Sequence, residues 1–280
     1  MKFSSRRRSG RRTRRVARKR TFRKRRATAR PMTRRKILDI TSIKKHDNML
    51  PVVKTSAGVV QAPGPITLTG SAFLVYMPSA RNNEAFEAGE SGRARQLIYA
   101  KGYKEKASYY FGPDPWAHRR IVFRMKGPLL FGQSGDIAPW LDVETPTSIG
   151  MVRLLNQPPS AQFIRYRDYL FDGQEGVDWA TIINAKVDTS RVDLLYDKTF
   201  TLNSGNQSVK VVTRKYWHPI NKNLLYSDDE AGETGLNSYI STSSKAGCGD
   251  IYVVDYFEPG MPTPNPLSFG SEGTFYWHEK

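Results

Sequence analysis

Apolar and polar residues alternate along much of this chain with a period of two, the spacing of a β-strand with one buried face. The clearest alternation covers residues 192–202. Residues 203–206 supply turn chemistry and residues 208–216 return as a Val- and Thr-rich run, so the two runs predict a β-hairpin. Residues 251–257 form a continuous β-branched and aromatic run, which is typical of a buried central strand.

Weaker strand patterns fill much of the remaining chain. A first strand or strand pair is expected between residues 37 and 53, and further strands at 66–77, 97–111, 119–126, 151–155, 163–171 and 274–278. Residues 81–95 are predicted to be a long loop or a short helix, and residues 127–148 an extended surface loop. Residues 178–183 are compatible with the start of a short helix.

These elements amount to about eight or nine strands with little helix, uneven spacing and no internal repeat. Strands that are separated by long irregular connections favour a two-sheet sandwich over a regular barrel or a propeller. We therefore predict an all-β fold for residues 37–280, a single jelly roll whose eight strands form a two-sheet sandwich with long loops.

The charge of the chain is concentrated at its N-terminal end. The sequence has 44 Lys and Arg, 26 Asp and Glu, and a net charge of +18. Residues 1–36 hold 19 of the basic residues and no acidic one, which leaves residues 37–280 with a net charge of −1. A polycation of this density cannot bury its charge, so residues 1–36 are predicted to be an Arg-rich arm that stays disordered until it meets a polyanion.

The basic residues of the arm form short clusters that are separated by Ser, Gly, Thr and Ala. Because a guanidinium group binds two phosphate oxygens at once, we expect the clusters to bind a nucleic-acid backbone without reading its sequence. The expected contacts are Arg6, Arg7, Arg8, Arg11, Arg12, Arg14, Arg15, Arg18, Lys19, Arg20, Arg23, Lys24, Arg25, Arg26, Arg34, Arg35 and Lys36.

The same basic runs fit a nuclear localisation signal. An Arg-rich N-terminus without acidic residues also fits a mitochondrial presequence, but such a presequence needs an amphipathic helix. The apolar residues of the arm, Phe3, Val16, Phe22 and Met32, do not recur at helical spacing. The nuclear signal is therefore the preferred interpretation.

A second set of basic and aromatic residues lies in the body and is expected to contribute nucleic-acid contacts on the inner surface of an assembly. Residues 119–126 are predicted to form a half-buried strand with a basic outer face, and the run around Trp217 resembles a base-stacking platform. Basic residues on any solvated face, and aromatic residues in a core or a subunit contact, explain the same patterns without nucleic acid. The candidates are Arg120, Arg124, Arg165, Arg167, Arg214, Lys215 and Trp217.

No catalytic constellation stands out, so no enzymatic activity, cofactor, metal or small-molecule substrate is predicted. The chain has no phosphate-binding loop and no Gly-x-Ser-x-Gly motif, and its four histidines are far apart. Cys248, His218 and Asp250 could be combined into a nucleophilic triad, but any chain of this size offers such combinations. The acidic run Asp228 to Glu230 is compatible with a divalent cation, a solvated loop or a partner for basic side chains.

The cysteine content and the distribution of apolar residues indicate the cellular compartment of the protein. The single cysteine, Cys248, excludes a disulfide framework and suits a reducing intracellular compartment. The sequence has no run of 18 apolar residues, so no membrane span is predicted. The charged N-terminus lacks the apolar segment of a secretory signal.

Several motifs, taken in order, carry a resemblance to a known family. They are ILDITSIKKHDNMLP from Ile37, YDKTFTLNSGN from Tyr196, RKYWHPINKNLLYSDDE from Arg214, GCGDIYVVDYF from Gly247 and the terminal FYWHEK. Together with the Arg-rich arm, they resemble the capsid proteins of genomoviruses, which are small circular single-stranded DNA viruses of the gemycircularvirus kind. None of these motifs is catalytic, so the specificity comes from their number and order.

The resemblance implies a jelly-roll subunit that self-assembles, in about sixty copies, into a closed T=1 icosahedral shell. It also implies a packaged circular single-stranded DNA genome, a host nuclear import receptor as a partner, and a location in the virion and the host nucleus. Geminivirus coat proteins are distant relatives, but their Cys/His metal motif has no counterpart here because Cys248 is alone.

Two other classes of protein remain as alternatives. A cellular nucleic-acid-binding protein, ribosomal or associated with chromatin, would also explain the arm, although such proteins usually spread basic residues over the folded body. The nearly neutral body of this chain argues against that class. An enzyme with a targeting arm is disfavoured because no site is found.

Overall fold

The computed structural model describes residues 32–50, 52–83, 92–127, 138, 140–143, 150–231, 234–235, 238–262 and 264–280. Most of the predicted arm, residues 1–31 with its Arg clusters, therefore lies outside the described residues. No helix in the described part of the chain is long and apolar enough to cross a membrane.

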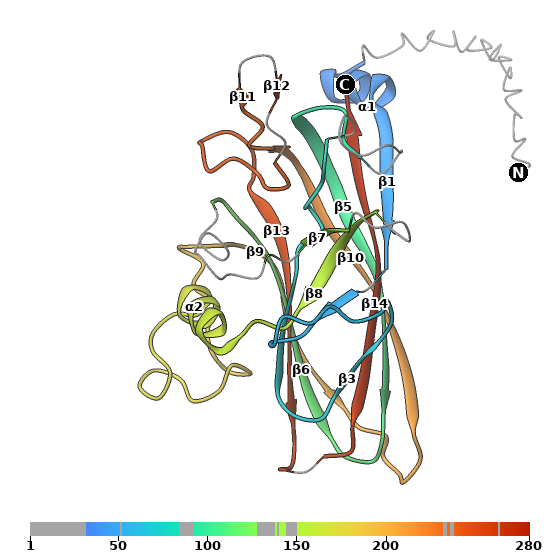
Figure 1. Ribbon diagram of the computed structural model, residues 1–280, viewed down its shortest axis with the longest axis vertical. Coiled ribbons are helices and arrows are strands. Elements are labelled where there is room, and N and C mark those ends of the chain that lie inside the picture. The colour runs from blue at the N-terminus through green and yellow to red at the C-terminus, as the bar shows by residue number, and fades with distance from the viewer. Residues whose placement is uncertain are drawn as a thin grey trace, which may run out of the picture.

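Two β-sheets, each named here after a central strand, make up the body (Figure 1). The β5 sheet contains, in spatial order, β1 (Ile43–Met49), β14 (Leu267–Glu279), β5 (Leu97–Phe111) and β10 (Lys210–Leu225), with β3 (Ile66–Leu68) also paired to β14. The β13 sheet contains β2 (Val52–Lys54), β8 (Gly150–Asn156), β4 (Ala72–Tyr76), β13 (Asp250–Pro259), β6 (Trp116–Met125) and β9 (Asp193–Leu202), with β7 (Trp140–Val143) on β8. A small hairpin joins β11 (Glu230–Ala231) to β12 (Thr234–Gly235), and the helices are α1 (Arg34–Thr41) and α2 (Ser160–Leu170).

The strand order is that of a jelly roll. The strands β1, β4, β5, β6, β9, β10, β13 and β14, numbered one to eight, lie in the orders 1-8-3-6 and 2-7-4-5. Each neighbouring pair in these two rows is antiparallel. Apart from the step from β6 to β9, the chain changes sheet after every one of the eight strands. The predicted eight-stranded, two-sheet sandwich is confirmed.

The main core fills the space between the two sheets with large aromatic side chains, among them Tyr103, Tyr109, Trp116 and Trp277. A second cluster lies on the opposite side of the β13 sheet, where Phe73 and Phe123 pack beneath α2. Figure 1 shows α2 on this outer side of the β13 sheet. Both faces of the β13 sheet are therefore buried.

The helix α2 replaces the strand that was predicted at residues 163–171, and that prediction is wrong. Gln162, Tyr166 and Leu170 are its buried residues, and they recur every four positions, which is a helical period. Pro159, at the N-cap, marks the start of the helix. Arg165 and Arg167 consequently lie on a helix and do not share the face of a strand.

The start of the folded body also differs from the prediction. Arg34, Arg35 and Lys36, which were assigned to the arm, form the first turn of α1, and residues 37–41 are helical rather than part of a first strand. The side chain of Thr33 caps this helix by accepting a hydrogen bond of 3.4 Å from the backbone N–H of Lys36. Strand β1 begins only at Ile43.

Two further predictions, the hairpin of residues 192–216 and the single strand at residues 66–77, are also wrong. The strands β9 and β10 do not form a hairpin, because β9 pairs with β6 and β10 pairs with β5 in the other sheet. Residues 66–77 divide into β3 and β4, which also belong to different sheets. Alternation defines two faces of a strand but not its partner, and packed sheets are only about 10 Å apart, so a short connection spans them.

The basic outer face that was predicted for residues 119–126 does not exist, because β6 is covered on both sides. Arg120 is 0 % exposed and Arg124 is 4 % exposed. Arg120 donates hydrogen bonds of 2.7 and 2.8 Å to the two carboxylate oxygens of Asp255, and another of 2.8 Å to Glu105. His118 Nε2 lies 2.6 Å from Asp255 Oδ1. Arg120 is therefore a structural ion of the core and not a surface contact for DNA.

Burial and charge act against each other in this cluster. Burial raises the pKa of Glu105, and the charge of Arg120 offsets only part of that effect. Burial also acts to raise the pKa of Asp255, but the charge of Arg120 and the hydrogen bond with His118 outweigh it and hold that pKa below its ordinary value. The cluster thus depends on the presence of Arg120.

Replacing Arg120 with methionine should destabilise the fold by about 3–5 kcal/mol, because it leaves two buried carboxylates without their counter-ion. Urea denaturation measures the loss. The control is Lys198→Met, at the exposed position opposite Arg120 on β9, which should change stability by less than about 0.5 kcal/mol. Equal stabilities of the two variants would contradict the structural role of Arg120.

Asp250, at the start of β13, is a second buried acid. Its Oδ2 atom accepts hydrogen bonds of 2.9 Å from the backbone N–H and the hydroxyl of Ser241, and its Oδ1 atom accepts one of 3.2 Å from Ser79. Burial outweighs these bonds and raises the pKa of Asp250 from 3.8 to about 6. The folded protein consequently holds this proton more tightly than the unfolded chain does.

Between about pH 4 and pH 6, this difference should make the contribution of Asp250 to stability fall as the pH rises. We expect the stability of Asp250→Asn, relative to the unchanged chain, to increase across this window by roughly 1–3 kcal/mol. Denaturation curves of both proteins at several pH values measure the difference, from which other titrating groups cancel. A difference that is constant with pH would show that Asp250 does not titrate there.

Candidate nucleic-acid interface

The outer face of the β5 sheet gathers exposed lysines and aromatic rings. On β5, Tyr103 and Tyr109 point into the core, so Lys104 and Lys106 point outward. The neighbouring strands follow the same alternation. The residues of this lysine–aromatic face are Lys44 and His46 of β1, Lys104 and Lys106 of β5, Lys215 and Trp217 of β10, and Tyr276 of β14.

Strand register places like charges directly opposite each other on this face. Lys215 lies across from Lys106, and Trp217 lies across from Lys104. Like charges at directly opposed positions destabilise a strand pair. Glu272 of β14 is opposite Lys106 on its other side and supplies one counter-charge. The face therefore keeps an excess of positive charge that a bound polyanion would neutralise.

A row of rings runs across the same face. Trp217 is 49 % exposed, and its ring lies 5.9 Å from that of Tyr276, which in turn lies 5.9 Å from that of His46. The indole covers Gly102, where an added Cβ atom would come within 2.5 Å of the Trp217 ring. Exposed rings beside lysines suit single-stranded nucleic acid, because bases stack on the rings while the cations meet phosphates.

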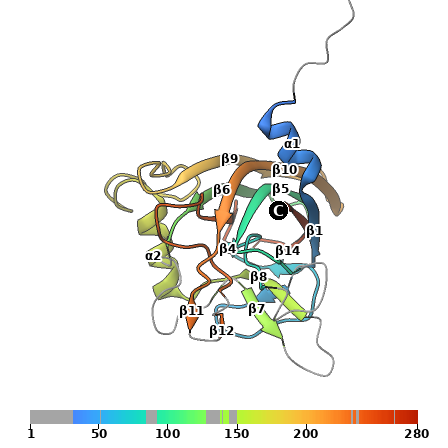
Figure 2. The same ribbon diagram turned by 90° about the horizontal axis from the view of Figure 1, so that it is seen from above.

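Helix α1 stands at one end of this face. Asp39 of α1 lies 3.8 Å from the ring of His278, the outward-facing neighbour of Lys44 across β1 and β14. A cleft of about 940 Å³ between the helix and the sheet is lined by Arg34, Lys36, Lys101 and Lys280, among other residues. Helix α1 projects away from the sandwich (Figure 2), and the contact of Asp39 with the outward-facing His278 places the helix on the side of the lysine–aromatic face.

The body residues that the sequence analysis proposed as nucleic-acid contacts lie in different environments. Lys215 and Trp217 lie on the lysine–aromatic face. Arg214 points to the opposite side of β10, and its guanidinium lies 4.1 Å above the ring of Phe200. Arg167 of α2 pairs with Asp168 on the same helix and with Glu175 beyond its end, and Arg165 also belongs to α2. These three arginines, like the buried Arg120 and Arg124, are not part of the face.

Several residues of the face were not identified from sequence, namely Lys44, His46, Lys104, Lys106 and Tyr276. A signal for two of them was present, because Lys104 and Lys106 are two residues apart in a run that was predicted to be a strand. Their exposure follows only from the sheet that this strand joins and from the absence, among the described residues, of a helix over the centre of that sheet (Figure 1).

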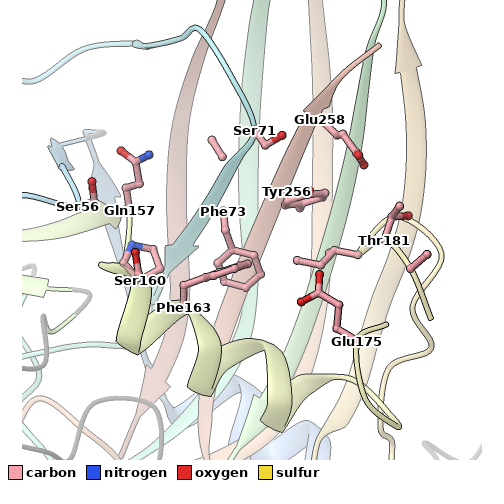
Figure 3. Close-up of a pocket in the computed structure, with 14 residues that line it drawn as sticks. Ser56, Ser71, Phe73, Gln157, Ser160, Phe163, Glu175, Thr181, Tyr256 and Glu258 are labelled. Carbon is pink, nitrogen blue, oxygen red and sulfur yellow. The ribbon is translucent and has the colours of Figure 1, made fainter. Parts of the chain in front are cut away.

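The outer side of the β13 sheet holds a pocket with an acidic rim. Figure 3 shows a pocket of about 510 Å³ on the outer side of the β13 sheet, with Phe73 and Tyr256 on the strands, Phe163 on α2, and the carboxylates of Glu175 and Glu258 at its rim. Neither Lys nor Arg lines this pocket. Burial, and then the charge of Glu258, raise the pKa of the Tyr256 hydroxyl. The sandwich is therefore basic on the β5 side and acidic in this pocket.

Cys248, His218 and Asp250, which were considered from sequence as a nucleophilic triad, are not arranged for catalysis. The Asp250 carboxylate is bonded to two serines, and the ring of His218 stacks on Tyr216 at 5.9 Å within the core. Burial lowers the pKa of His218 to about 4.

The acidic run has a partner within the chain. Asp228 accepts two hydrogen bonds of 2.5 Å from Arg93 and one of 2.9 Å from the backbone N–H of Ser238. No group of three or more potential metal ligands occurs among the described residues.

Comparisons with known proteins add little to this description. No family model matches the chain, and no curated protein matches its sequence. Among solved structures, the VP1 pentamer of human polyomavirus 6 is 12 % identical, with 86 % of this chain and 95 % of that chain covered and a TM-score of 0.16. An unassembled VP1 pentamer of Washington University polyomavirus is 8 % identical, with 89 % and 97 % covered and a TM-score of 0.11. The assignment of the jelly-roll fold therefore rests on the strand order itself.

Changing Lys215 to glutamate tests the lysine–aromatic face. The new carboxylate would lie opposite Lys106, so the variant should be more stable in urea by about 0.2–1 kcal/mol. Its affinity for a single-stranded oligodeoxynucleotide should fall, and the slope of log affinity against log salt should decrease by about 1. The control is Lys210→Glu, at the other end of β10 and opposite Phe111. Equal losses of affinity in both variants would exclude a specific role for the face.

Proposed function

We propose that this protein is the capsid subunit of a small single-stranded DNA virus of the genomovirus kind. In this proposal the jelly-roll body forms the wall of a closed shell, and the lysine–aromatic face and the basic arm meet the genome inside it. The observation that carries the proposal is that α1, which follows the arm in the chain, lies on the same side as this face, while the opposite side presents an acidic pocket. A subunit that is polarised in this way has one side for a polyanion.

The charge partition supports the same assignment. The 19 cations of residues 1–36 belong to a chain whose remaining residues carry a net charge of −1. About sixty copies would bring roughly 1,100 arm charges into the shell, enough for a strand on the order of a thousand nucleotides at one charge per phosphate. Weak binding by each arm becomes strong when many arms hold one strand.

Exposed apolar side chains support assembly into a homo-oligomer. Ile37 and Ile40 of α1 are 44 % and 59 % exposed, and Ile43 at the start of β1 is 62 % exposed. Side chains of this kind, gathered at one end of a molecule, are typical of a contact with another protein. We assign this patch, which adjoins the arm, to a contact between subunits.

The arm has a second proposed role before assembly. Its Lys and Arg clusters provide a signal for a host nuclear import receptor, which would bring the subunit to the nucleus, where circular single-stranded DNA is packaged. No enzymatic step, cofactor or small-molecule substrate is part of the proposal. A cellular nucleic-acid-binding protein would share the DNA contacts but would not form a closed shell.

The full chain and a chain that lacks residues 1–31 test the proposal. We expect the full chain to form closed particles of uniform size in electron micrographs and to protect single-stranded DNA from nuclease, with protection that falls at high salt. The shortened chain keeps α1 and the body, so it should retain subunit contacts but lose most of the protection. A full chain that stays monomeric in all conditions, including with single-stranded DNA, would refute the capsid assignment.

A matched control separates the charge of the arm from its length. In this control the Arg and Lys residues between positions 6 and 26 are replaced by glutamine. It should behave like the shortened chain if charge neutralisation is the function of the arm. Protection equal to that of the unchanged protein would show that the arm does not act through its charge.

A further inference from the structure

A second basic cleft, separate from the lysine–aromatic face, lies at one end of the sandwich. It has a volume of about 740 Å³ and is formed where β6 ends, β9 begins and β10 bulges. Its lining contains four cations and one carboxylate, together with the side-chain amides of Asn221 and Asn223. The charged residues are Arg124, Lys126, Arg191, Lys222 and Asp193. The excess of positive charge indicates an anionic ligand.

Arg124 is the central residue of this cleft. Its side chain is 4 % exposed, and its Nη2 atom donates a hydrogen bond to the Asp193 carboxylate. The Nε and Nη1 atoms of the same guanidinium are buried and have no acceptor among the described residues. A buried charged donor without an acceptor is costly, by several times the net value of an ordinary hydrogen bond. These two nitrogens lie on different edges of the guanidinium plane, and an anion in the cleft would supply an acceptor for one of them.

The bulge in β10 brings a second cation to the cleft. Register shifts between Pro219 and Lys222, and Asn221 adopts a positive φ of 48°. A bulge re-aims the side chains next to it. Here the Lys222 ammonium comes within 3.5 Å of the Asp193 carboxylate that also binds Arg124, and its side chain remains 55 % exposed. Lys222 is therefore free to move from Asp193 onto an incoming anion.

The remaining two cations of the cleft are already engaged with backbone carbonyl groups. Lys126 donates to the carbonyl oxygens of Ser244 and Lys245, and Arg191 donates to that of Asp168. Neutral carbonyls do not cancel the charge of Lys126, whereas Arg191 also forms an ion pair of 2.9 Å with Asp188. Lys126 consequently raises the local positive potential, while Arg124 and Lys222 supply direct contacts.

We propose that this cleft binds one phosphate group, held by Arg124 and Lys222 with the amides of Asn221 and Asn223 beside it. Free phosphate and a phosphodiester of single-stranded DNA share the required chemistry. The assignment of the phosphate to single-stranded DNA rests on the proposed function, and the position of the cleft favours this assignment. The cleft shares Tyr99, Asn221 and Asn223 with the one beneath α1, so the two clefts adjoin.

The single cysteine of the chain reports on occupancy, because Cys248 lines this cleft and is partly exposed. The full-length protein is treated with iodoacetamide at pH 8.5, and alkylation is followed by intact mass. Inorganic phosphate at ten times its dissociation constant should slow alkylation roughly tenfold, with sodium chloride at equal ionic strength as the reference. An oligothymidylate without terminal phosphates, used as a separate probe, tests the phosphodiester source.

Three variants locate the effect. Lys222→Gln and Arg124→Lys should lose the protection by phosphate, since the first removes the mobile cation and the second removes the guanidinium donors. Lys210→Gln makes the same change as the first variant at an exposed position at the far end of β10 and should keep the protection. Because Lys222 is exposed, Lys222→Gln should fold normally even if Arg124→Lys does not.

Protection by both probes supports the site and its DNA source. Protection by phosphate alone supports the site and excludes the phosphodiester. No protection of the unchanged protein by either probe, or equal protection of Lys222→Gln and Lys210→Gln, would overturn the inference. Nuclease protection in assembled particles, measured on the same preparations, distinguishes the two failures, since it depends on the arm and not on Cys248 accessibility.

Discussion

The ion cluster of Arg120, Glu105 and Asp255 is the constraint on which the arrangement of the two sheets depends. Glu105 belongs to the β5 sheet, whereas Arg120 and Asp255 belong to the β13 sheet, so the cluster ties the sheets together across the core. The cluster also fixes which side chains of β5 point inward and which point outward. Because Glu105 must point inward to reach Arg120, Lys104 and Lys106 on either side of it must point outward. The basic surface of the protein thus follows from a buried acid.

The two sheets then take different roles. The β13 sheet is covered on both faces, by the main core and by α2, and it serves as the scaffold of the body. The β5 sheet has one face on the core and presents the other, with its lysines and rings, to a partner. Helix α1 joins the arm to the edge of this exposed face. Binding surface and scaffold are therefore divided between sheets rather than between domains.

Sequence alone predicted the fold class and several strands well. The bounds predicted for residues 97–111 coincide with β5, and residues 251–257 lie within the central strand β13. The predictions failed where tertiary packing decides the outcome. Alternation placed Arg120 and Arg124 on one face of β6 but could not show that α2 buries the other face, which leaves β6 no solvated side. For the same reason the lysines of β5 were not recognised, while arginines that serve the core were.

The repulsion between Lys106 and Lys215 has a consequence for how sequences of this kind change. A chain selected only for stable folding would place opposite charges at these two positions, since the exchange of one lysine for an acid requires no rearrangement of the backbone. This chain carries a like-charged pair at these positions at the expense of stability, and the proposed polyanion would neutralise it. Substitution at these positions is therefore expected to be limited by the ligand of the face and not by the fold.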